Sequence, residues 1–307
     1  MRDAVCKALV GLCVERKFAF FTGDLGFMAL EPLRDAMGGM FINAGVAEQN
    51  MVSVAAGVAS EGMQAWVYSI APFVYARPLE QIRNDICSHG FDVKLVGNGG
   101  GYAYGSMGAT HHAIEDYGLM LPLQGMRVFV PVFTEDVDAV VRKVSHTYGP
   151  AYLRLGRGEK PAGFAIPPYA PWRKVLDGGG PALLAVGPLC GGYIGPLLKL
   201  EEKSRPQLWA LAELPLATSP PPDEFIARVE KGDALFVAEE HVIQGSAGQA
   251  VAYHLMNAGV RCRRFAHFHA AGYPSGLYGS QSFHRSESGI GPDSVIRKIA
   301  DKMRTDG

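Results

Sequence analysis

Short apolar segments alternate with segments of helical hydrophobic spacing along most of this chain, and this alternation limits its fold more than any other feature. In the first half, the predicted strands are segments rich in apolar and β-branched residues, at 18–21, 40–43, 65–68, 93–96, 127–132 and 151–155. The predicted helices fall between them, at 29–37, 46–60, 76–88 and 134–147. Such an order is typical of a mostly parallel sheet with helices on both faces.

A proline-rich passage divides this pattern into two parts. Between residues 160 and 172, four prolines lack the backbone N–H that a regular helix or strand needs: Pro161, Pro167, Pro168 and Pro171. The alternation then resumes, with predicted strands at 182–187, 207–212, 234–241 and 261–268 and predicted helices at 196–203, after Pro220 and at 247–258. We therefore expect an α/β fold of two consecutive domains, each with a mostly parallel sheet flanked by helices. They are expected at 1–160 and 181–307, joined by a linker at 161–180.

The composition excludes several classes of protein. The 29 lysines and arginines nearly balance the 30 aspartates and glutamates, which argues against a nucleic-acid-binding protein. No uninterrupted apolar run approaches the length of about 18 residues that a membrane-spanning helix requires, so no membrane partner is expected. The five cysteines are scattered and form no C-x-x-C pair. We expect reduced thiols and a cytoplasmic location.

The segment at 41–62 carries the most chemical information. A predicted strand ends at Asn43, Gly45 allows a turn, and a long helix follows with Glu48 in its first turn. Ligands of such α/β sheets collect at the carboxyl ends of the strands, so Glu48 is well placed for chemistry. The alternative is that Glu48 only complements the positive end of the helix dipole.

The residues around Glu48 match a known family. Six segments resemble, in order, the pyrimidine-binding domain of transketolases: FFTGDLG (20–26), NAGVAEQNMVSVAAGVASEG (43–62), FVYARPLEQIRNDI (73–86), GATHHAIEDYGLM (108–120), VFVPVFTEDVDAVV (128–141) and YLRLGRG (152–158). They look closest to the separately encoded C-terminal half of split transketolases, with deoxyxylulose-phosphate synthase a more distant relative. The second half is similar, more loosely, to that family's C-terminal domain through 182–187 and 236–255.

This resemblance implies a site for thiamine diphosphate. In the family, the glutamate that matches Glu48 bonds N1′ of the aminopyrimidine ring and favours the tautomer that removes the proton from C2 of the thiazolium ring. The resemblance also implies that Phe73 stacks against the aminopyrimidine, with Ile70 where an aromatic residue is usual. Ordinary core packing is the alternative for Phe73.

Three further residues are expected to contact the cofactor. They are Asp24 and Leu25, in the GDLG turn, and Arg77, in the segment that follows Phe73. Asp24 either orders a loop, as in the family, or bonds the amides of its own turn. Both interpretations of Asp24 stay open at this point.

The expected substrate residues lie around a Gly-x-Thr-His motif. His111 matches the family histidine that lies beside the reacting carbon and bonds a substrate oxygen, and His112 follows it. Met107 stands where the family usually has an aspartate that contacts sugar hydroxyls. Gly99 stands where it usually has a histidine near a phosphate. We expect Met107, His111 and His112 at the substrate.

Other departures from the family also bear on the substrate. Arg157, in the LGR segment, is the expected phosphate-binding residue, a structural role being the alternative. Gly26 replaces the serine or threonine usual after Asp-Leu. The glycine-rich segment at 97–108 is expected to form a flexible active-site loop. These departures predict a sugar or sugar phosphate other than an ordinary ketose of the pentose phosphate pathway.

One half of the cofactor site is missing from the sequence. The family holds the diphosphate and Mg²⁺ with a Gly-Asp-Gly motif and a later asparagine, whereas the two Gly-Asp pairs here, at 23–24 and 232–233, precede leucine and alanine. The other acidic residues form no comparable cluster, so no metal ligands are expected in this chain. The resemblance then implies a diphosphate-binding partner subunit that binds Mg²⁺, in a heterotetramer of two plus two chains.

The implied activity is transfer of a two-carbon ketol unit from a ketose or ketose phosphate to an aldose. In this interpretation the chain is the C-terminal subunit of a split transketolase and acts only with its partner. Three alternatives remain: the β subunit of a 2-oxoacid dehydrogenase, a deoxyxylulose-phosphate synthase-like enzyme, and a partner subunit without catalytic function.

Overall fold

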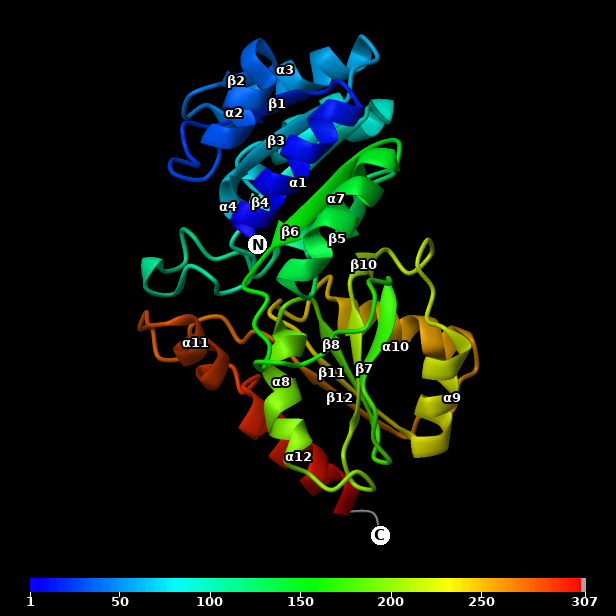
Figure 1. Cartoon of the computed structure of the whole chain (residues 1–307). Coiled ribbons are helices and arrows are strands. Elements are labelled where there is room, and N and C mark those ends of the chain that lie inside the picture. Colours follow the sequence, from blue (N-terminus) through cyan, green and yellow to red (C-terminus); the bar gives the residue numbers. More distant parts are fainter. Residues whose placement is uncertain (305–307) are drawn as a thin grey trace.

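Two α/β domains follow one another in the computed structural model, which describes residues 1–304 (Figure 1). The first contains a seven-stranded sheet in the order β10-β5-β6-β4-β3-β1-β2, parallel throughout except for the pair β10–β5. Its strands are β1 (Ala19–Thr22), β2 (Phe41–Asn43), β3 (Ala65–Ile70), β4 (Val93–Asn98), β5 (Arg127–Phe129), β6 (Ala151–Leu155) and β10 (Glu213–Leu214).

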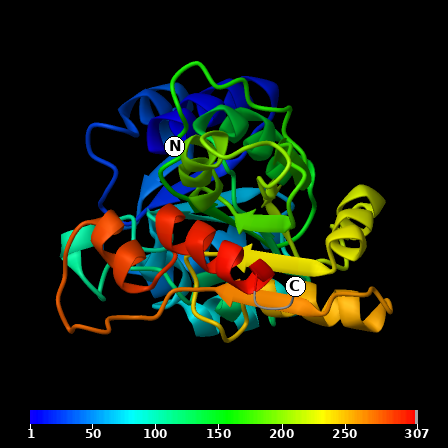
Figure 2. The same ribbon diagram turned by 90° about the horizontal axis from the view of Figure 1, so that it is seen from below.

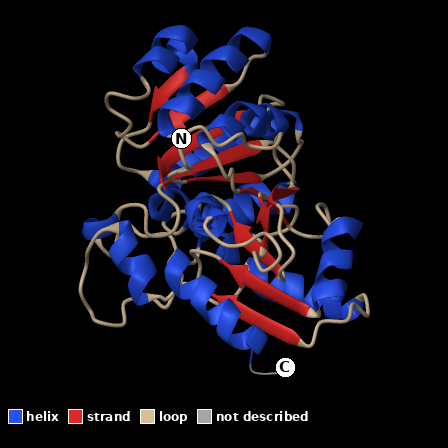
Figure 3. Ribbon diagram, turned by 60° about the horizontal axis from the view of Figure 1, so that its bottom comes forward, coloured by secondary structure: helices blue, strands red, loops and turns tan. Residues whose placement is uncertain are grey.

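Helices cover both faces of this first sheet (Figure 3). Its α-helices are α1 (Arg2–Glu15), α2 (Glu31–Met37), α3 (Glu48–Ser60), α4 (Ala71–Tyr75), α5 (Leu79–Gln81), α6 (Asp116–Met120) and α7 (Val137–His146). Shorter helical segments are η1 (Gly38–Met40), η2 (Ile82–Ile86), η3 (Cys87–His89), η4 (Gly105–Met107) and η5 (Thr134–Asp136).

Side-chain alternation along the strands divides the core of the first domain into two layers. On β3, Trp66 and Tyr68 face the layer that α1 and α7 cover, whereas Val67 faces α3. Helix α7 fits its layer because its valines recur at helical spacing and are all buried: Val137, Val140, Val141 and Val144. Strands buried on both faces read as continuous apolar runs, which explains why β3 and β6 were predictable.

The second domain contains a five-stranded sheet in the order β12-β11-β8-β9-β7. Its strands are β7 (Trp172–Leu176), β8 (Ala182–Val186), β9 (Gln207–Leu211), β11 (Ala234–Ala238) and β12 (Arg264–Phe268). Its helices are α8 (Leu189–Leu198), α9 (Asp223–Gly232), α10 (Ala247–Asn257), α11 (Gln281–Glu287) and α12 (Pro292–Arg304). Residues of α9 and α10 pack on one face of this sheet and those of α8 and α12 on the other. The predicted α/β class with two mostly parallel sheets is therefore confirmed.

Two strands lie outside the domains that the sequence predicts for them. Strand β10 comes from the second half of the chain, yet it pairs antiparallel with β5 in the first sheet. Strand β7 lies inside the range expected as a linker, 161–180, and pairs antiparallel with β9. Residues 160–171 contain no helix or strand, as the prolines there predict.

A buried polar network joins the domains. The Arg154 side chain, on β6, lies 2.8 Å from Asp116 and donates hydrogen bonds to the carbonyls of Ala113, at 2.9 Å, and Glu240, at 2.8 Å. Glu240 belongs to the second domain, and its carboxylate pairs with Arg285. Burial alone would lower the pKa of Arg154, but the negative charge of Asp116 raises it overall.

Within residues 1–304, no helix combines the length and the apolar character that crossing a bilayer would require.

Candidate active site

Glu48 lies at the start of α3, one short turn after β2 ends. Gly45 makes that turn with a φ of +71°, a conformation that suits glycine. The Glu48 carboxylate is only 4% exposed and accepts a hydrogen bond of 2.7 Å from the Arg77 guanidinium. A buried carboxylate at the carboxyl edge of a parallel sheet is held where ligands of such folds bind.

Phe73 provides an aromatic surface beside this carboxylate. Strand β3 ends at Ile70, Pro72 lies in the first turn of α4, and Phe73 follows it, half-buried. The central guanidinium carbon of Arg77 lies 3.8 Å from the centre of the Phe73 ring. Glu48, Phe73 and Arg77 therefore form one contact cluster, while Ile70 is half-buried at the junction of β3 and α4.

His111 completes this cluster from the loop between β4 and α6. Its ring centre is 5.3 Å from that of Phe73, with the two planes at 66°, an edge-to-face contact. Its Nδ1 lies 2.9 Å from the hydroxyl of Thr110, so Thr110 helps to fix the orientation of the ring. The structure thus brings Glu48, Phe73 and His111 into one cluster from three separate segments, with Arg77 linking Glu48 to Phe73.

The second domain supports the loop that carries His111. Helix α11 lies beside this loop (Figures 1 and 2), and the backbone of Gly105 packs against that of Gly279 and Gln281. A side chain at Gly108 would meet the ring of Tyr278. The glycine-rich loop therefore packs closely against the second domain.

His112 belongs to this support and not to the substrate cleft. It is buried, its Nε2 donates to the Gly105 carbonyl at 2.7 Å, and its Nδ1 accepts from the Tyr273 hydroxyl at 3.0 Å. Burial lowers the pKa of His112, which favours this neutral form. With both ring nitrogens engaged, His112 has no free nitrogen for the predicted contact with substrate.

A cleft of about 450 Å³ opens beside the His111 loop. Arg157 and Met107, two predicted substrate residues, both line it. The remaining lining residues are Met1, Arg2, Asn98, Gly99, Ala103, Tyr104 and Gly156. The lining thus contains two arginines and no carboxylate, but Arg2 pairs with Asp3 at 3.2 Å. The positive charge that suits an anionic group therefore comes mainly from Arg157.

Tyr104 occupies the place that Gly99 leaves open. Gly99 has a φ of +82°, and a Cβ there would overlap the Tyr104 ring. Asn98 donates a hydrogen bond of 2.9 Å to the Tyr104 hydroxyl, and the Tyr104 ring centre is 5.8 Å from that of His111. Burial raises the pKa of Tyr104, so its hydroxyl stays protonated.

Tyr104, Asn98 and Arg2 were not singled out from the sequence as cleft residues. Asn98 and Tyr104 lie in the glycine-rich segment at 97–108 that was expected to form an active-site loop. Which side chain of this segment fills the space at Gly99 depends on the course of the loop, and no motif indicates Arg2.

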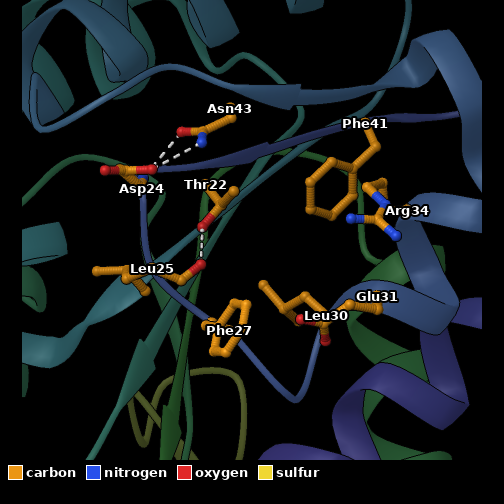
Figure 4. A pocket seen from close by; sticks show the side chains of 10 residues that line it. Thr22, Asp24, Leu25, Phe27, Leu30, Glu31, Arg34, Phe41 and Asn43 are labelled. Atoms are coloured by element: carbon orange, nitrogen blue, oxygen red, sulfur yellow. Dashed lines mark hydrogen bonds between the residues drawn. The ribbon is translucent and has the colours of Figure 1, made fainter.

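Asp24 and Leu25 lie in the turn after β1, beside a pocket of about 320 Å³ (Figure 4). Asp24 and Asn43 exchange two hydrogen bonds of 2.9 Å, and the Leu25 carbonyl accepts a bond of 2.9 Å from Thr22. Asp24 therefore bonds the end of β2, not the amides of its own turn. Gly23, next to Asp24, packs beside the Glu48 carboxylate, which connects this turn to the site.

Comparison with known proteins identifies the family. Residues 4–161 match the family described as the transketolase pyrimidine-binding domain. The chain belongs to the transketolase family. Transketolases use thiamine diphosphate, and the match ends one residue beyond the predicted domain boundary at 160.

Individual relatives are described as parts of transketolases. A subunit of the apulose-4-phosphate transketolase of Actinobacillus succinogenes is 29% identical over 262 residues, which cover 83% of this chain and 82% of the relative. A putative transketolase C-terminal section of Methanocaldococcus jannaschii is 31% identical over 69% of this chain and 67% of the relative. A solved structure described as a split gene transketolase, inactive β4 tetramer, superimposes with a TM-score of 0.82 at 28% identity, covering 98% and 97% of the two chains. The chain is therefore related to the C-terminal subunits of split transketolases.

The residues present fit one end of the transketolase cofactor. A buried carboxylate, Glu48, near a partly exposed aromatic ring, Phe73, suits the donor groups and flat faces of an aminopyrimidine. The diphosphate end has no such match, because no group of three or more histidine, cysteine or acidic side chains suited to a metal occurs within residues 1–304.

Proposed function

We propose that this chain is the pyrimidine-binding subunit of a split transketolase, which transfers a two-carbon ketol unit from a ketose to an aldose. The observation that carries this proposal is the meeting of Glu48, Phe73 and His111 at the carboxyl edge of the first sheet. Core packing alone would not explain a partly exposed ring that Arg77 links to a buried carboxylate. This cluster of three side chains also argues against the alternative of a subunit that has lost its catalytic function.

A second subunit completes the site in this proposal. Supporting evidence is the absence of a Gly-Asp-Gly motif from the sequence and of a metal-binding cluster from residues 1–304. Exposed apolar side chains lie on the loop after β1 and on the turn before Glu48: Phe27 is 83% exposed, Met28 80% and Val46 71%. Large apolar side chains exposed to this degree suit a protein interface. A relative whose description reads inactive β4 tetramer fits a chain that needs a partner, and we propose a heterotetramer of two plus two chains.

The chain's own groups have distinct parts in the proposed mechanism. Bound thiamine diphosphate supplies the nucleophilic carbon and the electron sink for cleaving the bond next to the ketose carbonyl. Glu48 holds a proton against the pyrimidine nitrogen, in a buried place where water does not compete for it. His111 donates a hydrogen bond to a substrate oxygen and takes part in moving its proton. Mg²⁺ and the diphosphate are bound by the partner subunit.

The cleft beside His111 indicates the class of substrate. Arg157 offers positive charge, and Arg2 is a second arginine that pairs with Asp3 at 3.2 Å, whereas Met107 cannot bond sugar hydroxyls as the aspartate usual in the family does. An anionic sugar with few hydroxyls near its charged end fits this lining. The name of the A. succinogenes relative, apulose-4-phosphate transketolase, refers to a phosphorylated sugar, which supports a sugar phosphate here.

Reconstitution tests the proposed function. The chain is co-expressed with a candidate partner that carries Gly-Asp-Gly and a downstream asparagine, and ketol transfer to an aldose phosphate is measured. We expect turnover by the pair, and little binding of thiamine diphosphate with Mg²⁺ by the isolated chain. Decarboxylation of a 2-oxoacid alone would indicate the 2-oxoacid dehydrogenase alternative. Decarboxylation of a 2-oxoacid followed by condensation with an aldose phosphate would indicate the deoxyxylulose-phosphate synthase-like alternative. No turnover would indicate a subunit without catalytic function. Tight cofactor binding by the isolated chain would contradict the shared site.

Replacing Arg157 with glutamine should weaken binding of a phosphorylated substrate. Losing a charged hydrogen bond to phosphate costs about 1.5–3 kcal/mol, so KM should rise roughly 10- to 100-fold with little change in kcat. The measurement is steady-state kinetics of the two-subunit enzyme, with Arg304→Gln, on the exposed end of α12, as the control. An unchanged KM would mean that Arg157 is structural.

A further inference from the structure

The Arg77 side chain lies across the candidate cofactor site and touches both of its main groups. One end of the guanidinium is 2.7 Å from the Glu48 carboxylate, and its centre is 3.8 Å from the centre of the Phe73 ring. Arg77 itself is 44% exposed, whereas Glu48 is 4% exposed. A solvent-accessible side chain therefore supplies the charge partner of a buried one.

This arrangement has a physical reason. A buried carboxylate without a partner is costly, and an aromatic face attracts a flat cation. Guanidinium is planar and carries N–H donors at its edge, so a single group satisfies the carboxylate and covers the ring. An aminopyrimidine ring has the same two properties, a flat face and nitrogen atoms at its edge that bond a carboxylate.

We propose that Arg77 is a stand-in for the aminopyrimidine, which keeps Glu48 paired and Phe73 covered until the cofactor displaces it. This inference rests on the proposed function, which makes Glu48 and Phe73 the pyrimidine site, and it replaces the expected contact of Arg77 with the cofactor by a competition between the two. A ring stacked on Phe73 and bonded to Glu48 would occupy the space that the guanidinium fills. Cofactor binding therefore competes with an internal group, and Arg77 can leave because its side chain already reaches water.

The competition predicts an unusual gain of binding on mutation. The probe is 4-amino-5-hydroxymethyl-2-methylpyrimidine, which lacks the diphosphate and needs no partner subunit, titrated into the isolated full chain and followed by NMR. We expect Arg77→Ala to bind it about tenfold more tightly than the natural chain, because the competing cation–π and ion-pair contacts are gone. Arg83→Ala, which removes an exposed arginine on η2, serves as the control and should leave binding unchanged.

Chemical complementation separates a stand-in from a merely structural residue. Guanidinium chloride at low millimolar concentration should weaken probe binding to Arg77→Ala and leave the natural chain unaffected. Arg77→Lys keeps the charge but not the flat group, and its affinity should lie between the other two. Circular dichroism checks that each variant is folded.

Two results would overturn the proposal, and they differ. If the natural chain binds the probe as tightly as Arg77→Ala, the proposed role of Arg77 is wrong, while the assignment of the pyrimidine site to Glu48 and Phe73 is kept. If neither chain binds it, or if Glu48→Gln in the Arg77→Ala background binds it equally well, the pyrimidine site itself is wrong and the stand-in fails with it.

Discussion

Replacing Glu48 with glutamine should lower kcat of the two-subunit enzyme by at least about 100-fold, the scale at which proton-transferring groups contribute to catalysis. Glutamine keeps the size and the carbonyl oxygen of glutamate, so the start of α3 should keep its structure. The proton that Glu48 would share with the pyrimidine nitrogen is lost. Steady-state kinetics measure kcat, and circular dichroism checks the fold.

The alternative role of Glu48 makes a different prediction. If its charge only complements the dipole of α3, removing the charge costs about 0.3–1 kcal/mol of stability and leaves kcat unchanged. Glu61→Gln, at the exposed carboxyl end of the same helix, is the matched control. Near-normal turnover of Glu48→Gln would refute its catalytic assignment.

The strands were predictable because most of them are buried on both faces. Strand β6 has the predicted bounds, 151–155, and β3 starts at the predicted residue, since a parallel strand between two helix layers needs a run of apolar residues. The expected helix at 196–203 was misplaced, because α8 spans Leu189–Leu198. The glycines and Pro196 of α8 have low helix propensity, so propensity alone does not predict this helix. Gly191 has a packing reason, because a Cβ there would collide with the Glu159 carbonyl.

Pairings between distant segments could not be predicted. Strand β10 has two residues, and its place beside β5 depends on how the domains meet, not on its own composition. Strand β7 begins directly after Pro171, the last proline of the proline-rich passage, and lies within the range expected as a linker. It is an edge strand with one neighbour, β9.

The sequence could predict those residues of the candidate site whose positions follow directly from the course of the backbone. Glu48 and Phe73 each follow a strand end, so topology brings them together. The two adjacent histidines could not be told apart by spacing, because Tyr273 of the second domain and the Gly105 carbonyl hold His112 away from the cleft. The orientation of Arg77 over Phe73 likewise depends on side-chain packing that no motif encodes.

Replacing Asp116 with alanine should destabilise the chain by about 3–5 kcal/mol, the usual cost of breaking a buried ion pair by removing one partner. Asp116 is fully buried, accepts a hydrogen bond of 2.9 Å from Tyr152, and lies 2.8 Å from Arg154. Without it the Arg154 guanidinium keeps its carbonyl acceptors but loses its counter-charge. Urea unfolding of the full chain measures the change.

Two further variants identify charge burial as the cause. Asp138→Ala removes a carboxylate that is 63% exposed and paired with Arg142, and it should cost less than about 1 kcal/mol. Adding Arg154→Met to Asp116→Ala removes the stranded charge and should restore part of the lost stability. A loss below about 1 kcal/mol for Asp116→Ala alone would contradict this account. Arg154 also bonds the Glu240 carbonyl of the second domain, so the same buried pair takes part in the contact between the domains.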